Sequence, residues 1–197
     1  MNLKYLLVAG LLLMTTGIAG LNASNQKENR NNMENLTLTK EWDKTFPKSD
    51  KIDHSKVTFV NRYGITLAAD MYKPKGATGK LPAIAVCGPF GAVKEQAAGL
   101  YAQEMAERGF LTIAFDPSFT GESGGTPRYM TSPDINTEDF SAAVDYLVTN
   151  PEVDREKVGI IGICGWGGIA INAAASDPRI KATLASTMYD TVSYTHL

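Results

Sequence analysis

One segment, residues 157–168 (KVGIIGICGWGG), constrains the fold of this chain more than any other. It begins with a nearly continuous run of β-branched residues, which is typical of a strand buried on both faces of a parallel sheet. The run leads directly into a glycine-rich turn that holds one nucleophilic side chain, Cys164. A strand that passes through such a turn into a helix forms a nucleophile elbow, in which the central residue projects away from the sheet. The segment therefore predicts a parallel sheet with a reactive thiol at the end of one strand.

Strand and helix patterns alternate through the rest of the chain. Apolar strands are predicted over residues 81–87, 110–116, 158–163 and 180–186, and helices over residues 94–108 and 137–149. In the second helix, apolar residues recur at the three- and four-residue spacing of one helical face. Residues 56–62 and 65–73 are predicted to form an antiparallel hairpin, because only a Tyr-Gly turn separates them. This order predicts an α/β fold with a mostly parallel sheet and helices on both faces.

The glycine-rich turn resembles the elbow of a known fold. Its letters, GICGWGGIA, are similar to the G-x-S-x-G elbow of the α/β-hydrolase fold, and the cysteine variant resembles the dienelactone hydrolase branch. Two other segments match this fold in the same order. GPFGAVKEQ (88–96) lies where the fold places an oxyanion-stabilising loop, and PSFTGESGG (117–125) is similar to its D-x-x-G-x-G-x-S turn. The resemblance covers residues 56–190 and implies an α/β-hydrolase fold.

The elbow departs from the family pattern at two positions. Cys164 replaces the usual serine, and a thiolate is intrinsically the stronger nucleophile. Trp166 stands where the pattern has a glycine that lets the helix and the strand approach closely. We therefore expect the indole to point in another direction, with Gly167 and Gly168 supplying the missing space.

An acyl-transfer site also needs two preorganised N–H donors for the developing oxyanion. One is expected from the backbone of Gly165, which follows the nucleophile. The resemblance places the second in the loop after residues 81–87, where Pro89 has no N–H to donate. Phe90 is therefore the first candidate and Gly91 the second. The alternative is that GPFG only forms a tight turn.

The remaining catalytic residues of the family, an acid and then a histidine, follow the nucleophile on later loops. The chain contains two histidines. His54 precedes the predicted first strand and is expected on the surface. His196 follows Asp190 but stands one residue before the end of the chain, where few contacts orient a side chain. Neither is predicted to be the catalytic base, so we expect an α/β-hydrolase fold that is incomplete at the C-terminus, the N-terminal portion of a longer hydrolase.

Other polar residues near these motifs have less specific roles. Asp116, Gly121 and Ser123 match the structural turn of the family, and the resemblance implies that they are scaffolding. Lys94 and Glu95 are expected at the solvated start of a helix, and contact with substrate is the alternative.

Cys164 itself has two alternatives to a nucleophilic role. One is a small side chain buried for packing. The other is a disulfide with Cys87, because both cysteines end strands that are neighbours in the α/β-hydrolase sheet, within reach of such a bond. An oxidising compartment would favour that bond.

Composition and the N-terminal segment define the remaining expectations. Residues 1–23 have the charged start, apolar centre and small residues of a signal peptide, residues 24–55 are predicted to be a polar linker, and residues 56–197 form the hydrolase domain. We therefore expect an exported protein, periplasmic or secreted, that leaves the membrane after cleavage. A net charge of −2 argues against nucleic-acid binding. The sequence has no metal-ligand spacing and no phosphate-binding loop, so neither a metal nor a cofactor is expected.

Together these patterns predict an exported hydrolase of small esters or lactones with Cys164 as its nucleophile. Gly165 and Phe90 are the expected oxyanion donors. The alternative is a non-catalytic hydrolase-like binding protein or an inactive fragment, for example one with a Cys87–Cys164 disulfide.

Overall fold

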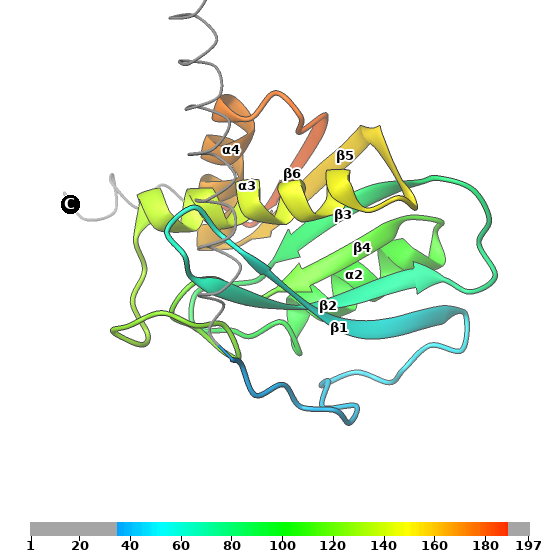
Figure 1. Cartoon of the computed structure of the whole chain (residues 1–197), viewed down its shortest axis with the longest axis horizontal. Coiled ribbons are helices and arrows are strands. Elements are labelled where there is room, and N and C mark those ends of the chain that lie inside the picture. The colour runs from blue at the N-terminus through cyan, green and yellow to red at the C-terminus, as the bar shows by residue number, and fades with distance from the viewer. Residues whose placement is uncertain (1–34, 189–197) are drawn as a thin grey trace, which may run out of the picture. The chain divides into compact units, whose positions relative to one another are not determined.

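The computed structural model describes residues 35–188, which form a six-stranded sheet with helices on both faces (Figure 1). The strands are β1 (Ile52–Val60), β2 (Thr66–Pro74), β3 (Leu81–Cys87), β4 (Leu111–Phe115), β5 (Val153–Ile163) and β6 (Ala182–Ser186), and the helices are α2 (Ala97–Glu107), α3 (Pro133–Thr149) and α4 (Gly165–Ser176). The strand order is β1-β2-β4-β3-β5-β6. β2 pairs antiparallel with β1 and with β4, and the other pairs are parallel. This arrangement confirms the predicted α/β fold with a mostly parallel sheet.

Two hydrophobic layers lie on opposite faces of the sheet. In one layer, Phe140 and Leu147 of α3 pack with strand residues that include Ile160. In the other, alanines of α2 such as Ala102 pack with Ile161. Neighbouring residues of β5 face different layers because side chains alternate along a strand. This explains why the strand before the elbow is apolar at nearly every position.

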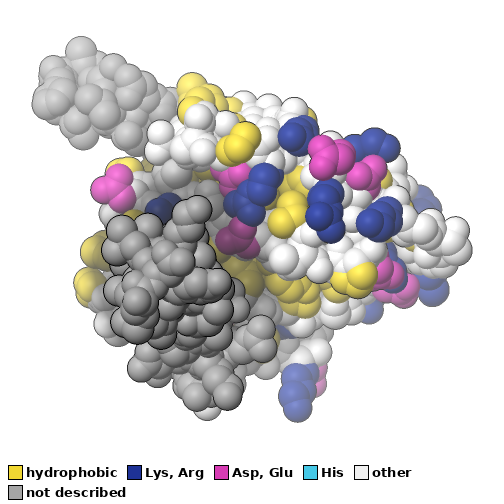
Figure 2. All heavy atoms as spheres, turned by 45° about the horizontal axis from the view of Figure 1, so that its top comes forward, with side chains coloured by type: hydrophobic (Ala, Val, Ile, Leu, Met, Phe, Trp, Pro, Cys, Tyr) yellow, Lys and Arg dark blue, Asp and Glu magenta, His cyan; other side chains and the backbone are white. Residues whose placement is uncertain are grey.

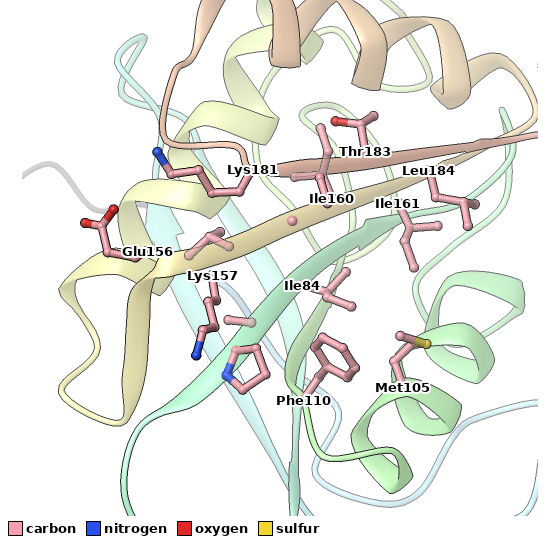
Figure 3. Close-up of a pocket in the computed structure, with 15 residues that line it drawn as sticks. Ile84, Met105, Phe110, Glu156, Lys157, Ile160, Ile161, Lys181, Thr183 and Leu184 are labelled. Carbon is pink, nitrogen blue, oxygen red and sulfur yellow. The ribbon is translucent and has the colours of Figure 1, made fainter.

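α2 covers only part of its face of the sheet. Beside it, β3, β5 and β6 form the floor of an apolar groove of about 580 Å³ (Figure 3). Apolar side chains that line it on the α2 face include Ile84, Met105, Phe110, Ile161 and Leu184. Cys164 does not line this groove, so the groove is separate from the elbow.

Three elements start earlier than the sequence predicted. β5 begins at Val153, five residues before position 158. β1 begins at Ile52, inside the segment 24–55 for which a polar linker was expected. The alternation of the strand continues back through His54 to Ile52, which is buried against the α2 layer. α3 begins at Pro133, four residues before position 137, because a proline suits the first turn of a helix.

Charged side chains of both signs share the surface. On the face shown in Figure 2, Lys and Arg side chains lie beside Asp and Glu side chains, with hydrophobic side chains between them. None of the helices within residues 35–188 is long and apolar enough to cross a membrane. The predicted signal peptide (residues 1–23), Asp190 and His196 lie outside the described residues.

Candidate active site

Cys164 stands at the sharp turn between β5 and α4. Its backbone has φ 60° and ψ −128°, a conformation that residues other than glycine rarely adopt. The turn is held on both sides: the Cys164 N–H donates to the Ser186 carbonyl at 2.8 Å, and the Cys164 carbonyl accepts from the Gly167 N–H at 2.9 Å. The side chain is half-buried and the thiol is free. The chain therefore has the geometry of an elbow, with a thiol at the C-terminal end of a parallel strand.

Gly162 lets α4 cross β5 in direct contact. A Cβ at this position would overlap the Trp166 carbonyl oxygen and would lie 2.7 Å from the Ala170 Cβ. Gly162, two residues before Cys164, therefore sets the distance between the helix and the strand.

Trp166 points into the core. Its side chain is buried, and its ring centroid lies 6.1 Å from that of Phe140 in α3 and 6.0 Å from that of Phe90. The expectation that the indole points in another direction is confirmed, and the role of Gly167 and Gly168 in supplying its space stays a prediction. A Cβ at Gly168 would meet nothing within 4 Å, and one at Gly167 would approach a residue after β6. The indole avoids the crowded elbow because it extends toward α3 instead.

The loop after β3 lies against the elbow. It contains a turn in which the Ala92 N–H donates to the Pro89 carbonyl at 3.1 Å and Gly91 has φ 76°. The Phe90 ring covers Gly165, since a Cβ on Gly165 would overlap the ring. Gly165 is the first residue of α4, where backbone N–H groups have no partner within the helix. The structure therefore brings Cys164, Gly165 and Phe90 together, and the tight turn and the contact with the elbow coexist.

The two cysteines do not form a disulfide. β3 and β5 are neighbours as expected, and Cys87 pairs with Gly162. However, Cys87 is buried in the layer of α3 and α4, whereas Cys164 packs against the layer of α2 on the other face. Both thiols are free, and burial raises the pKa of Cys87. The disulfide alternative is therefore wrong, because the side chains leave the sheet in opposite directions.

The turn after β4 is built around Asp116. Its carboxylate accepts the Lys94 N–H at 2.8 Å and the Glu122 N–H at 2.9 Å, and its carbonyl accepts the Ser123 hydroxyl at 2.7 Å. A Cβ at Gly121 would collide with the Asp116 carboxylate. These contacts confirm the expected scaffolding role of Asp116, Gly121 and Ser123.

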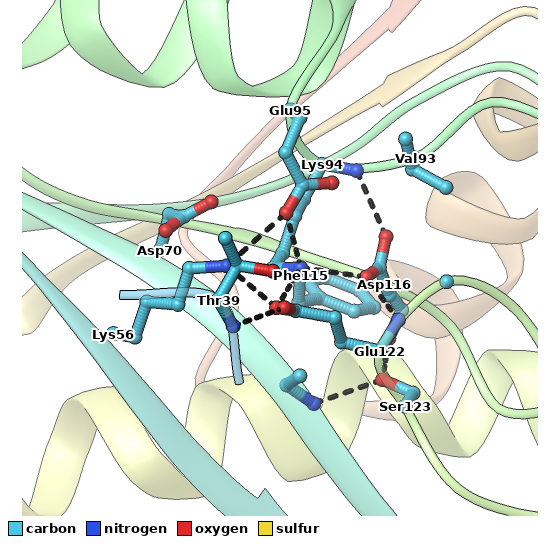
Figure 4. A network of polar contacts seen from close by, with 12 residues as sticks. Thr39, Lys56, Asp70, Val93, Lys94, Glu95, Phe115, Asp116, Glu122 and Ser123 are labelled. Carbon is cyan, nitrogen blue, oxygen red and sulfur yellow. Dashed lines mark hydrogen bonds and ion pairs between the residues drawn. The ribbon is translucent and has the colours of Figure 1, made fainter. Parts of the chain in front are cut away.

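Lys94 is buried among carboxylates, and the prediction of a solvated helix start is wrong (Figure 4). Its ammonium lies 2.8 Å from Asp116, 2.7 Å from Glu122 and 2.5 Å from Glu95. Burial disfavours the charged form, but the attraction of Asp116 and these hydrogen bonds outweigh it, so the pKa of Lys94 is raised. Asp116 and Glu122 follow Lys94 by 22 and 28 residues, so no local pattern in the sequence indicates this cluster. α2 accordingly begins only at Ala97.

Three carboxylates of this cluster are close enough to suggest a cation site. Oxygens of Asp43, Glu95 and Glu122 lie within 4.8 Å of one another. The Lys56 ammonium lies 2.6 Å from Glu122 and 3.4 Å from each of the other two, and Lys94 contacts Glu95 and Glu122. Protein ammonium groups therefore already supply the positive charge that a metal would bring.

Comparison with known proteins identifies the family. The family model of X-Pro dipeptidyl-peptidases (S15 family) matches residues 63–196. The chain belongs to this α/β-hydrolase family.

Relatives of this hydrolase include bacterial and fungal proteins. The protein PA2218 of Pseudomonas aeruginosa is 62% identical over 191 residues, which cover 95% of this chain and 51% of the relative. The crystal structure of PA2218 has a TM-score of 0.78 at 70% identity and covers 80% of this chain and 49% of that chain. The thiohydrolase aneE of Aspergillus aculeatus is 33% identical over 132 residues, 67% of this chain and 41% of the relative. This chain thus spans about half the length of these curated relatives or less.

Structures of dienelactone hydrolase type share the fold. One from Klebsiella pneumoniae has a TM-score of 0.59 at 21% identity and covers 70% of this chain and 60% of that chain. At this identity the likeness concerns the fold.

His54 of this hydrolase is placed differently from the expectation. It lies within β1, and its side chain is largely buried between the rings of Trp42 and Tyr72. The centroid of the imidazole lies 5.2 Å from the centroid of each of these two rings. Its Nε2 atom lies 2.7 Å from Asp70 Oδ1. Four strand spacings, together ~19 Å, separate β1 from β5. His54 therefore cannot contact Cys164, in agreement with its predicted exclusion from catalysis, although it is neither before the first strand nor on the surface.

Proposed function

We propose that the protein is a hydrolase of small carboxylic esters, lactones or thioesters that forms an acyl intermediate on Cys164. The backbone of Cys164, with φ 60° at a strand-to-helix corner, is the observation that carries this proposal. Such a conformation disfavours any side chain, so its presence at a nucleophile is consistent with a functional requirement. Membership of an α/β-hydrolase family supports the same reaction class.

The reaction begins when the Cys164 thiolate attacks the carbonyl carbon of the substrate. A carbon–sulfur bond forms, and the negative charge moves to the carbonyl oxygen, where the N–H groups of Gly165 and Phe90 stabilise it. The bond to the alcohol or thiol leaving group then breaks, and water hydrolyses the acyl-cysteine. In the family pattern, an acid and a histidine that follow the nucleophile carry the protons. Within residues 35–188, His54 is too far from Cys164 for that task.

The names of relatives support the choice of acyl compounds. A relative 33% identical to this chain is a thiohydrolase. A cysteine nucleophile is suited to thioesters, because its acyl intermediate is itself a thioester of similar energy and the leaving thiolate needs less protonation than an alkoxide.

We also propose that the protein is exported. The support is the N-terminal sequence, in which a short charged start, an apolar stretch and small residues follow one another within residues 1–23. N-terminal sequencing of the mature protein from separated cell fractions tests this proposal. An intact Met1 in the cytoplasmic fraction would refute it.

Acylation of the protein tests the chemistry directly. The wild-type chain is incubated with p-nitrophenyl acetate, and the acetyl group is located by mass spectrometry of the intact protein and its peptides. We expect acetylation at Cys164 and its loss in Cys164→Ala. The matched control is Cys87→Ala, which removes the other thiol and leaves the acetylation unchanged. Equal acetylation of wild type and Cys164→Ala would support the non-catalytic alternative.

A further inference from the structure

Lys94 closes one end of the loop that carries Phe90. The other end, Cys87, is fixed in β3, where it pairs with Gly162 of β5. Only residues 88–93 lie between these two anchors. A loop this short has few conformations once both its ends are fixed. The position of the Phe90 N–H therefore depends on how firmly Lys94 is held.

Asp116 holds Lys94 through both its main chain and its side chain. The Lys94 N–H donates to Asp116 Oδ1 at 2.8 Å, and the Lys94 ammonium donates to Asp116 Oδ2 at 2.8 Å. Both side chains are fully buried. Water is excluded from a buried contact of this kind, so it does not replace the ammonium when the lysine is removed.

Other carboxylates of the cluster contact the same ammonium. Glu122 and Glu95 also accept hydrogen bonds from the Lys94 ammonium, at 2.7 and 2.5 Å. Lys56 lies in the same cluster and donates to Glu122 at 2.6 Å. Among the described residues, however, Lys94 is the cation that contacts Asp116. Without its ammonium, Asp116 would keep the backbone N–H donors of residues 94 and 122, and the main-chain hydrogen bond of residue 94 would be left to hold the loop against the end of β4.

We propose that Lys94 is a positioning residue for the oxyanion hole. By holding the far end of the loop against Asp116, it fixes the Phe90 N–H at the distance that the oxyanion on Cys164 requires. Misplacing a donor by about 1 Å weakens transition-state stabilisation even though the donor remains present. This inference rests on the proposed function, because it concerns the acylation of Cys164.

Two reactions of Cys164 in the 197-residue protein separate positioning from a purely structural role. Acylation by p-nitrophenyl acetate passes through an oxyanion, whereas alkylation by iodoacetamide does not. In Lys94→Met, we expect the acylation rate constant to fall about 10²-fold, the lower end of the cost of losing one oxyanion donor, with little change in the alkylation rate.

Two further variants complete the experiment. Lys56→Met is the matched control, because it removes a second, largely buried cation from the same cluster without touching Asp116, and both of its rates should stay at the wild-type value. Lys94→Arg retains a cation beside Asp116 and should recover part of the acylation rate. If Lys94→Met does not fold, Lys94→Arg is compared with the wild type. A lower ratio of the acylation rate to the alkylation rate supports the inference, and an unchanged ratio overturns it.

The possible outcomes are distinct. Wild-type acylation rates in both Lys94 variants would overturn the inference. A parallel loss of acylation and alkylation would also overturn it, because that result means that Cys164 itself has moved. A wild-type chain that is not acylated at Cys164 would refute the proposed function, and this inference with it.

Discussion

Gly162→Ala is expected to destabilise the protein because α4 touches β5 at this position. The new Cβ would overlap the Trp166 carbonyl oxygen and lie 2.7 Å from the Ala170 Cβ. Since carbon atoms in contact are normally about 3.5–4.0 Å apart, α4 has to move by about 1 Å. One of the colliding atoms is backbone and cannot rotate away. We therefore expect a loss of about 3 kcal/mol, the upper end of the usual cost of overpacking.

Gly168→Ala is the matched control for this experiment. Gly168 lies in the same helix, but a Cβ there would meet nothing within 4 Å. Alanine should raise the free energy of unfolding by about 1 kcal/mol, because it is the better helix former. Equilibrium unfolding in urea measures both variants, and iodoacetamide alkylation reports on Cys164. A Gly162→Ala variant as stable as the wild type would show that the helix and the strand are not in backbone contact, and the account of the elbow would be wrong.

Three further predictions concern the thiols, the charge cluster and the core. In the native protein, iodoacetamide should modify Cys164 quickly and Cys87 only after unfolding, because Cys87 is buried and its pKa is raised; rapid modification of both would contradict the packing described for β3. Hydrogen bonds from Lys56 and Lys94 outweigh burial and lower the pKa of Glu122 from 4.5 to about 2. Its stabilising contribution is therefore present above pH 4.5 and lost as the pH falls toward 2, and Glu122→Gln should flatten the pH dependence of the unfolding free energy in that window. Trp166→Gly, which restores the family's elbow letter, should lower stability by about 3–5 kcal/mol in chemical denaturation, because it empties the space beside Phe140; an unchanged unfolding midpoint would argue that the indole is not a core residue.

The sequence predicts those parts of the molecule that depend on neighbouring residues. The alternation of strands and helices, the corner at Cys164 and the turn around Asp116 all follow from short stretches with characteristic spacing. The backbone geometry at each of these positions is determined locally, by glycines and by the reversal of the chain. The position of Cys164 beside Phe90 and Gly165 could therefore be anticipated from motif order.

The parts that were predicted wrongly depend on residues far apart in the sequence. Lys94 is buried because Asp116 and Glu122 neutralise it, and a lysine beside a helix start gives no sign of such partners. The alternative of a disulfide between Cys87 and Cys164 is wrong for a related reason. Strand order shows that β3 and β5 are neighbours, but the face that each cysteine occupies depends on where its strand ends relative to the pleat. The position of His54 was also predicted wrongly, but here the sequence held local information. The alternation of buried and exposed residues continues back to Ile52 and indicates a longer β1.

The left-handed backbone at Cys164 places a thermodynamic cost on the residue proposed to carry out the chemistry. Conformations of this kind cost about 1–3 kcal/mol for a residue with a side chain, and glycine adopts them freely. A protein engineering campaign that ranks variants by melting temperature alone would therefore enrich for loss of the thiol. Thermal screening of this hydrolase should be paired with a measurement of thiol reactivity, so that gains in heat tolerance are not obtained by discarding the nucleophile.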